Sequence, residues 1–437
     1  MRIVVVFKAS TDLPKEMPMS MGSFGSIRVM SYLSHNAKTA LEQFDYSLHE
    51  LNFCPLESWS IESLDPFYVY FIDPILKLGN LPLRCYYLDE SIQNIDFEYS
   101  IESSALGSLH LNDIFCGLEA KLTNSVHSMH TIEAGSIDLP SFSCSPIEAP
   151  IEQLLPISLG IFKCYEDVLA NLLVSEEVLY KFLQVIYSLY ICNDYHNFYH
   201  AVDVLQCSHF ILSDPILRSE LRDIDVFALL ISAVCHDVGH LGVNNGFLIS
   251  YKSDLALLYN DASPLENYHS FLANYILEKI DVCDFRRRWD RTLKQEFRKL
   301  LITSILSTDM AHHYRYISLY RSKEVLDSDR SLLLGMILKA ADLSNVVRPF
   351  KNSEKWSHCL KTEFYIQGEL EKKLGYRPIS KNMDKDADVF PESQASFLEV
   401  FALPLFKILI EYYPSLHYML DNLVENIEEW RRKIKIA

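Results

Sequence analysis

Two histidines and an aspartate lie close together in the segment CHDVGHLGVNN (235–245). His236 and His240 are four residues apart, so on a helix both imidazoles would lie on one face, with Asp237 beside them. Imidazole and carboxylate ligands together favour Zn²⁺, Mn²⁺ or Fe²⁺ over copper or an iron–sulfur cluster. A lone pair at this spacing is also typical of one packed and one exposed histidine, so the metal interpretation needs further ligands.

Such companions occur on both sides of that segment. The stretch NDYHNFYHAVDV places His196 and His200 one helical turn apart. Asp342 follows a strongly apolar helical stretch, where a carboxylate is costly unless it is paired or bound to a cation. His200, the HD dipeptide and Asp342 therefore come in the order H…HD…D. This order resembles that of the HD superfamily of metal-dependent phosphohydrolases.

Six longer motifs make the resemblance closer. They are YHNFYHAVDV, HDVGHLGVNNGFL, LALLYNDASPLENYH, ILSTDM, ADLSN and ESQASFLEVFALPL. Their order and rough spacing resemble the class I 3′,5′-cyclic nucleotide phosphodiesterases, and most of all the fungal high-affinity cAMP phosphodiesterases. The likeness covers roughly residues 155–432. The resemblance implies that a hydroxide activated by two metals hydrolyses cAMP to the 5′-monophosphate. A wider interpretation adds cGMP as a substrate.

The resemblance also implies a role for each matching residue. His200, His236, Asp237 and Asp342 match the ligands of a tightly held Zn²⁺, and Asp237 also bridges to a second metal, Mg²⁺ or Mn²⁺. His196 matches the general acid that protonates the leaving oxygen. Groups that hold waters or lie near the second metal match His240, Glu266, Thr308 and Asp309. Positions that bind the nucleotide match Gln394, Phe397, Asn345, Tyr195, Met310, Leu360 and Phe364.

Several features around these motifs leave alternatives open. A glutamine amide can present its donor and acceptor in either sense, so Gln394 alone does not select the purine. Three residues depart from the family pattern: Gly239, Leu241 and Tyr268 stand where an acidic residue, a proline and a histidine are common. His269, beside the Glu266 motif, is interpreted as structural, like the other isolated histidines.

Composition narrows the class of protein. The chain has 437 residues, 49% hydrophobic and 22% charged, with a formal net charge of −18. This charge argues against a nucleic-acid partner, and an anionic substrate would need local cations such as bound metals. Ten cysteines are scattered without a CxxC pair, and we expect neither a signal segment nor a membrane span. The economical interpretation is a cytoplasmic protein, with access to the nucleus left open.

The type of secondary structure that the sequence predicts changes along the chain. Short β-branched and aromatic runs at 3–7, 67–73, 83–88 and 95–101, with a helical pattern at 36–51, predict a small α/β or α+β domain over 1–133. A Ser/Pro-rich linker follows at 134–150, and residues 151–437 predict an all-α catalytic domain. The polar stretch 376–392 is interpreted as a flap over the base pocket or as a plain surface loop.

Two other functions stay open at this point. The chain could be a different HD-type phosphohydrolase, acting on a nucleoside monophosphate or dinucleotide, or a catalytically silent cyclic-nucleotide-binding protein. The N-terminal domain could be regulatory, form a homodimer, or pack on the catalytic domain.

Overall fold

The computed structural model describes residues 83–85, 95–97, 141–321, 330–376, 378–380, 382–387 and 389–436. These residues belong to two units, one made of 1–121 with 372–376 and the other of 122–371 with 377–437. In the first unit, strands β1 (Leu83–Cys85) and β2 (Ile95–Phe97) pair antiparallel, with Leu83 opposite Phe97. Both lie inside predicted strands. The other elements predicted before residue 134 lie outside the described residues, and the boundaries at 133 and 150 stay predictions.

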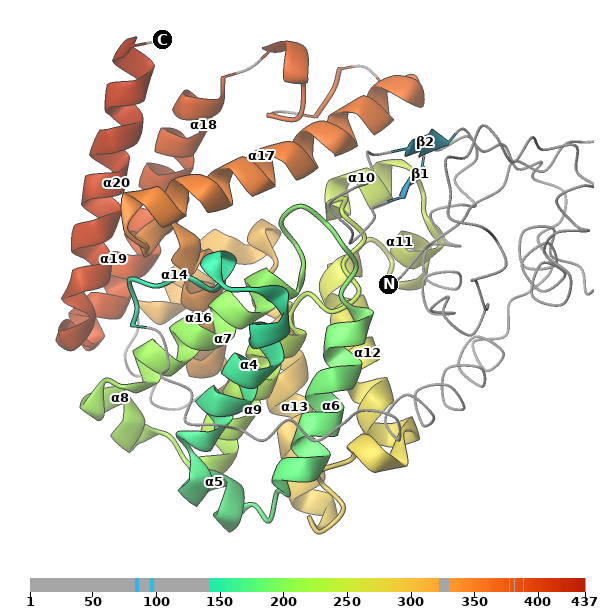
Figure 1. The fold of residues 1–437 in the computed structure, drawn as a ribbon, viewed down its shortest axis with the longest axis vertical. Helices are drawn as coiled ribbons and strands as arrows, with labels where there is room; N and C mark the ends of the chain where they lie inside the picture. The colour runs from blue at the N-terminus through green and yellow to red at the C-terminus, as the bar shows by residue number, and fades with distance from the viewer. Residues whose placement is uncertain are drawn as a thin grey trace, which may run out of the picture. The chain divides into compact units, whose positions relative to one another are not determined.

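The second unit is helical, as the sequence predicts for its catalytic region (Figure 1). Its α-helices are α4 (Leu154–Lys163), α5 (Glu166–Asn171), α6 (Glu176–Leu189), α7 (Phe198–Leu212), α8 (Pro215–Glu220), α9 (Asp223–Cys235), α10 (Asn245–Ser250), α11 (Asp254–Leu258), α12 (Pro264–Lys279), α13 (Arg291–Leu306), α14 (His313–Tyr320), α16 (Arg330–Asp342), α17 (Phe350–Lys373), α18 (Phe390–Phe397), α19 (Leu403–Tyr412) and α20 (His417–Ile436). Short 3₁₀ turns such as η7 (Met310–His312) and η8 (Leu343–Val347) connect them.

Helix α9 forms the centre of this unit. Every residue from Ile224 to Cys235 is buried, which is the expected environment of a helix that is apolar on all sides. Helices α7, α13 and α16 pack against it. The C-terminus of α9, the start of α7 and the end of α16 carry the histidines and aspartates singled out in the sequence, so the core of the unit sets their positions.

The continuous helical stretch from Phe390 to Tyr412 is not uniform. It consists of α18, the π-helical turn η10 (Leu398–Ala402) and α19. Pro404 lies in the first turn of α19, and its ring would clash with the carbonyl four residues earlier in a regular α-helix. Among the described helices this one is long and apolar enough to cross a membrane, but it packs on α20 and lines the cavity described below. The expected absence of a membrane span stays a prediction.

Residues 141–145, from the predicted linker, are tied to the helical unit. Phe142 stacks on the Arg348 guanidinium at 4.4 Å, and its carbonyl accepts a hydrogen bond from Arg348. The Ser145 hydroxyl accepts from the Trp356 indole and donates to the Asp203 carboxylate at 2.8 Å. This segment therefore contributes packing and hydrogen bonds to the helices that carry the site.

Candidate active site

His200 is presented by the first turn of α7. The Asn197 side chain accepts hydrogen bonds from the backbone N–H groups of Tyr199 and His200, which is the arrangement of a helix N-cap. His196 precedes this cap, so it does not lie on the helix, contrary to the interpretation of the two histidines as one turn apart. The two imidazoles can therefore point in different directions.

His236 and His240 also do not share a helix, which corrects the second spacing argument. Helix α9 ends at Cys235, and His236 is its C-cap residue. Gly239 adopts a φ of +74°, and a Cβ there would lie 2.6 Å from Leu272 and 3.2 Å from the Tyr268 ring. The turn thus requires glycine, and the bulky Tyr268 occupies the space beside it. This contact explains together why Gly239 and Tyr268 both depart from the family pattern.

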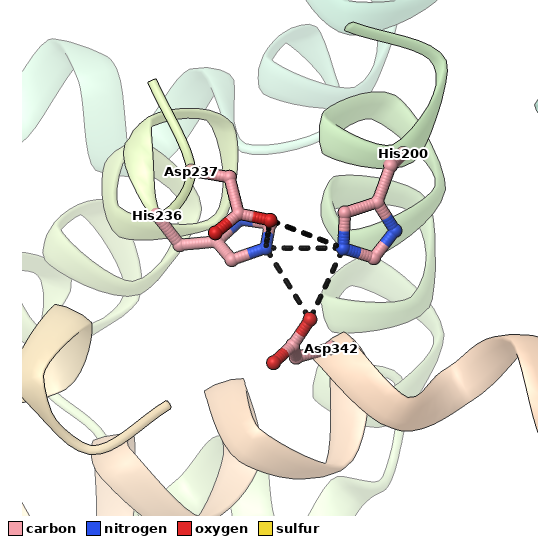
Figure 2. Close-up of side chains that lie close together, drawn as sticks. All are labelled: His200, His236, Asp237 and Asp342. Atoms are coloured by element: carbon pink, nitrogen blue, oxygen red, sulfur yellow. Dashed lines mark hydrogen bonds and ion pairs between the residues drawn. The ribbon is translucent and has the colours of Figure 1, made fainter. Parts of the chain in front are cut away.

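Four side chains converge between α7, α9 and α16 (Figure 2). His236 Nε2 lies 3.2 Å from His200 Nε2, 3.1 Å from Asp237 Oδ2 and 3.3 Å from Asp342 Oδ1. His200 Nε2 lies 3.1 Å from the same Asp342 oxygen. All four donor atoms lie within 4.8 Å of one another, and both imidazoles are buried. The structure therefore brings together the four residues predicted as metal ligands.

The hydrogen bonds of this cluster fit a metal ion. His236 Nδ1–H donates to the Ala233 carbonyl at 2.9 Å, which turns Nε2 toward the other three residues of the cluster. A cation bound among the four residues would replace the direct contact of the two Nε2 atoms, which lie 3.2 Å apart. Burial would raise the pKa of Asp342, but hydrogen bonds from His200 and His236 lower it below the usual range. Two imidazoles and two ionised carboxylates suit Zn²⁺ or another divalent transition metal.

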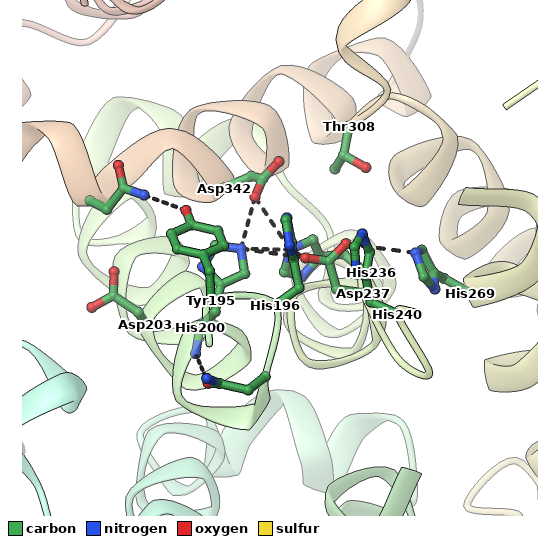
Figure 3. Close-up of polar contacts among 12 residues, drawn as sticks. Tyr195, His196, His200, Asp203, His236, Asp237, His240, His269, Thr308 and Asp342 are labelled. Atoms are coloured by element: carbon green, nitrogen blue, oxygen red, sulfur yellow. Dashed lines mark hydrogen bonds and ion pairs between the residues drawn. The ribbon is translucent and has the colours of Figure 1, made fainter. Parts of the chain in front are cut away.

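His196 forms a separate cluster with Glu363 and His240. Figure 3 shows the imidazoles of His196 and His240 beside Asp237. The Nδ1–H of His196 donates to Glu363 Oε1, while Glu363 Oε2 accepts the backbone N–H groups of Tyr195 and His196 at 2.9 and 3.0 Å. Burial alone would lower the pKa of His196, but Glu363 outweighs it, and the pKa rises to about 9. The imidazole is therefore protonated at neutral pH.

His240 stacks on His196 with ring centroids 3.9 Å apart, and it is neutral. Its Nδ1 accepts a hydrogen bond from the Gly242 N–H, and burial and the neighbouring His196 lower its pKa well below the usual value. Asn193 holds both loops, because its amide donates to the backbone carbonyls of His196 and His240 at 2.9 and 2.8 Å. The stacked pair thus consists of one charged and one neutral ring.

A third group of polar side chains extends from Asp237 to α12. His269 Nδ1–H donates to the Val238 carbonyl at 2.8 Å, which points Nε2 at Asp237 Oδ1, 3.7 Å away. Burial and the nearby Asp309 raise the pKa of Glu266 to about 7. Asp309 accepts hydrogen bonds from the Ser263 hydroxyl and the Ala311 N–H. These oxygens and His269 would suit a hydrated Mg²⁺ or Mn²⁺.

One cavity of about 510 Å³ connects the three groups. This volume is in the range of small-molecule sites. Its lining contains six carboxylates (Asp237, Glu266, Asp309, Asp342, Glu363 and Asp384) and a single lysine, Lys361. An anion would enter such a cavity only if cations balanced these charges. All the predicted site residues line it except His200 and His236, which are buried behind Asp237 and Asp342.

The predicted nucleotide-binding residues form another part of the cavity wall. Gln394 and Phe397 lie on α18, and the Ser357 hydroxyl contacts the Gln394 amide at 3.1 Å. Asn345 donates to the Tyr195 hydroxyl. Met310, Leu360 and Phe364 complete the wall. The same Ser357 hydroxyl contacts the Ser353 carbonyl at 2.9 Å, and since it has one proton, it does not fix the sense of the Gln394 amide.

The described part of the segment 376–392 borders this wall. Asn382, Asp384, Ala387 and Val389 line the cavity. Ser380 donates to the buried Glu371 carboxylate through its N–H and its hydroxyl, both at 2.7 Å. A Cβ at Gly368 would lie 1.8 Å from the Met383 carbonyl, so α17 meets the loop at a glycine. The loop therefore borders the cavity while hydrogen bonds and close packing hold it to α17.

Two residues of the site were not predicted as functional. Glu363 lies 167 residues after His196, and no local pattern links the two. His269 was interpreted as structural, whereas its imidazole faces Asp237. Its position three residues after Glu266 is the signal that could have identified it, because both lie near one face of α12.

Known proteins similar to this chain share the region that carries the site. The sequence profile of the family described as 3′5′-cyclic nucleotide phosphodiesterase matches residues 195–423. A cGMP-specific 3′,5′-cGMP phosphodiesterase of Dictyostelium discoideum is 36% identical over 264 residues, and the 3′,5′-cyclic-AMP phosphodiesterase 4C of Rattus norvegicus is 32% identical over 296. These alignments cover 59% and 64% of this chain and 56% and 55% of the relatives. The chain thus spans little more than half of their length.

Solved structures show the same fold. The phosphodiesterase domain of the rhodopsin phosphodiesterase from Salpingoeca rosetta superposes with a TM-score of 0.64 at 30% identity, covering 70% of this chain and 95% of that domain. The relatives named here come from an amoeba, a rat and a choanoflagellate, so the greater likeness to fungal enzymes stays a prediction. The matched residues 195–423 contain the four converging residues predicted as metal ligands, the cluster of His196, and Gln394. The chain belongs to the 3′,5′-cyclic nucleotide phosphodiesterase family.

Proposed function

We propose that the protein hydrolyses 3′,5′-cyclic AMP, and cyclic GMP to a lesser extent, to the 5′-nucleoside monophosphate. One observation carries the proposal: four converging candidate metal ligands, a histidine held by Glu363, and the side chains of Gln394 and Phe397 meet at a single cavity. The size of the cavity suits one nucleotide. Family membership supports the reaction class, and relatives named for each nucleotide support both substrates.

His200, His236, Asp237 and Asp342 would hold one divalent metal, and Asp237 with water bound by His240, His269 and Glu266 would hold a second. When bound, such cations neutralise the phosphodiester and lower the pKa of a water molecule toward 7. Zn²⁺ at the first site and Mg²⁺ or Mn²⁺ at the second are our assignments. They rest on the two imidazoles of the first donor set and on the carboxylates and waters of the second.

His196 would donate the proton to the leaving O3′ oxygen. Glu363 holds its Nδ1–H, which leaves Nε2–H for the substrate. The raised pKa keeps the acid form populated at neutral pH. Proton transfer of this kind typically contributes ~10²–10⁴-fold to the rate.

Phe397 would stack on the purine, and Gln394 would hydrogen-bond to its edge. Because Ser357 does not fix the sense of the amide, Gln394 can serve both adenine and guanine. Asn345 and the likeness of the sequence to cAMP enzymes are the grounds for our preference for cAMP.

A hydrolysis assay tests the proposal directly. The full-length chain, loaded with Zn²⁺ and Mg²⁺, is incubated with cAMP or cGMP, and the phosphorus-containing products are identified by ³¹P NMR. We expect the 5′-monophosphate alone, with the larger kcat/KM for cAMP. Failure to open either cyclic nucleotide would refute the proposed function.

A further inference from the structure

A lysine is buried directly beneath the cavity. Lys339 lies on α16, one turn before Asp342, and its relative exposure is 0%. Among the residues whose burial the structure describes, no other lysine is buried. An ammonium group is costly to bury unless its surroundings compensate it, so its position calls for an explanation.

The hydrogen bonds of Lys339 go to backbone carbonyls. Its Nζ donates to the Thr308 carbonyl at 3.2 Å and to the Asp309 carbonyl at 3.4 Å, and it lies 3.8 Å from Met310 Sδ. These three residues form the turn between α13 and η7, which carries Asp309 to the cavity. Within the described part of the chain no carboxylate forms an ion pair with this ammonium. The ammonium group therefore has hydrogen-bond acceptors, but no described carboxylate in contact with it neutralises its positive charge.

The positive charge of Lys339 lies in the protein interior, close to carboxylates that line the cavity. Burial lowers the pKa of Lys339 to about 8, while Asp342, Asp309 and Glu266 raise it, so all three carboxylates lie within its electrostatic reach. The same three carboxylates line the cavity. Glu266 and Asp309 belong to the oxygen-rich group next to Asp237, where a second divalent cation would bind, and Asp342 belongs to the first cluster. A fixed positive charge behind that group must oppose any cation entering from the front.

We infer that Lys339 is a positioning residue with two effects: its charge weakens the affinity of the second divalent-cation site, and its hydrogen bonds hold the Thr308–Met310 turn. The inference rests on the proposed function only in that this site takes Mg²⁺ or Mn²⁺. The charge keeps the second ion exchangeable in a cavity whose carboxylates would otherwise hold it too tightly.

Two substitutions separate the effects. Lys339→Met keeps an unbranched side chain that is one atom shorter, but removes the charge and the donor. Lys339→Gln removes the charge and keeps an amide that can donate to the Thr308 carbonyl. Lys299→Met is the matched control, because it makes the same charge change on the exposed face of α13, the helix that leads into the same turn.

Mn²⁺ binding to full-length protein already saturated with Zn²⁺ is measured by electron paramagnetic resonance, which detects free Mn²⁺ without substrate. We expect both Lys339 variants to bind Mn²⁺ about tenfold more tightly than wild type, and Lys299→Met to bind it like wild type. In the hydrolysis assay, Lys339→Met should lose kcat about tenfold with little change in KM, and Lys339→Gln should retain most of it. If Lys339→Met does not fold, Lys339→Gln decides the effect of the charge.

Equal or weaker Mn²⁺ affinity in the folded Lys339 variants, or no Mn²⁺ binding by the wild type, would overturn the inference. The binding result is independent of the hydrolysis result. Tighter binding in the variants of a wild-type protein that opens no cyclic nucleotide would support the role of Lys339 and refute the proposed function alone.

Discussion

Two clusters of histidines and carboxylates lie side by side in the helical unit and differ in what their nitrogens bind. In the first, Nε2 of His200 and Nε2 of His236 face each other at 3.2 Å, with carboxylate oxygens around them. In the second, His196 already shares its Nδ1–H with Glu363 and stacks on a neutral His240. The first cluster gathers four groups that could bind one metal ion, whereas in the second the Nδ1–H of His196 is held by a carboxylate.

The comparison shows that residue type alone does not assign a role. Both clusters combine imidazole with carboxylate at distances suitable for a metal. Orientation separates them: the Ala233 carbonyl accepts the Nδ1–H of His236 and turns Nε2 toward the cluster, whereas Glu363 raises the pKa of His196 to about 9 and keeps it protonated. The first arrangement favours a cation, and the second favours an acid. Four substitutions test this division, in order of decreasing effect.

The largest effect is expected from Asp342→Asn in the first cluster. The amide keeps the size of the side chain but loses the charge that balances a metal, so we expect loss of the tightly bound metal. Hydrolysis of cAMP should fall by at least about 10³-fold, because the low pKa of a metal-activated water is lost with the metal. Elemental analysis and a cAMP assay measure both. Asp254→Asn, at an exposed carboxylate on α11, is the control, and normal metal content in Asp342→Asn would contradict the assignment.

In the second cluster, His196→Ala removes the proposed acid and leaves the metal ligands untouched. We expect kcat to fall by about 10²–10⁴-fold with little change in KM. The expected loss is smaller than that of Asp342→Asn, because the activated water remains. A cAMP analogue with a better leaving group at O3′ needs less proton donation, so it should lose less activity than cAMP in this variant. An equal loss for both substrates would argue against His196 as the acid.

Glu363→Gln keeps His196 in place but removes its charged partner. The pKa of His196 then falls, because burial still lowers it and only the more distant Asp237 and Asp342 raise it. The neighbouring His240 is neutral. Because the acid form is the active one, the alkaline limb of kcat should move to lower pH by at least about one unit. We expect kcat at neutral pH to fall about tenfold. Glu369→Gln, exposed on the same helix, is the control, and an unmoved alkaline limb would contradict the coupling.

The smallest effect is expected at the far wall of the cavity. Gln394→Ala removes a hydrogen bond to the purine but touches neither cluster, so KM should rise about tenfold while kcat stays within about twofold. Steady-state kinetics with cAMP and cGMP measure both constants, with the exposed Gln153→Ala as control. A fall in kcat at constant KM would place Gln394 in the reaction rather than in base recognition.

The sequence predicted which residues meet more reliably than how they are held. Motif order identified His200, His236, Asp237 and Asp342, which converge. The helical spacing argument failed twice, because Asn197 starts α7 after His196 and because the chain turns at Gly239 with a positive φ. Capping and turn geometry of this kind depend on tertiary contacts.

Long-range partners were the least predictable part of the site. Glu363 and Lys339 act through contacts to segments 167 and 31 residues away, and neither stands in a motif. A glutamate or lysine on a helix is far more often on a solvated face. Only the fold brings Glu363 to His196, and only burial distinguishes Lys339 from a surface lysine.

The metal content of the matched pair His196→Ala and His200→Ala tests the division between the clusters most directly. Both variants remove one imidazole from the same short segment, and each is purified as the full chain from metal-supplemented cultures and analysed for Zn²⁺ by mass spectrometry. We expect His196→Ala to keep the full wild-type content of Zn²⁺ and His200→Ala to lose it. Loss of Zn²⁺ from His196→Ala, or retention by His200→Ala, would contradict this division.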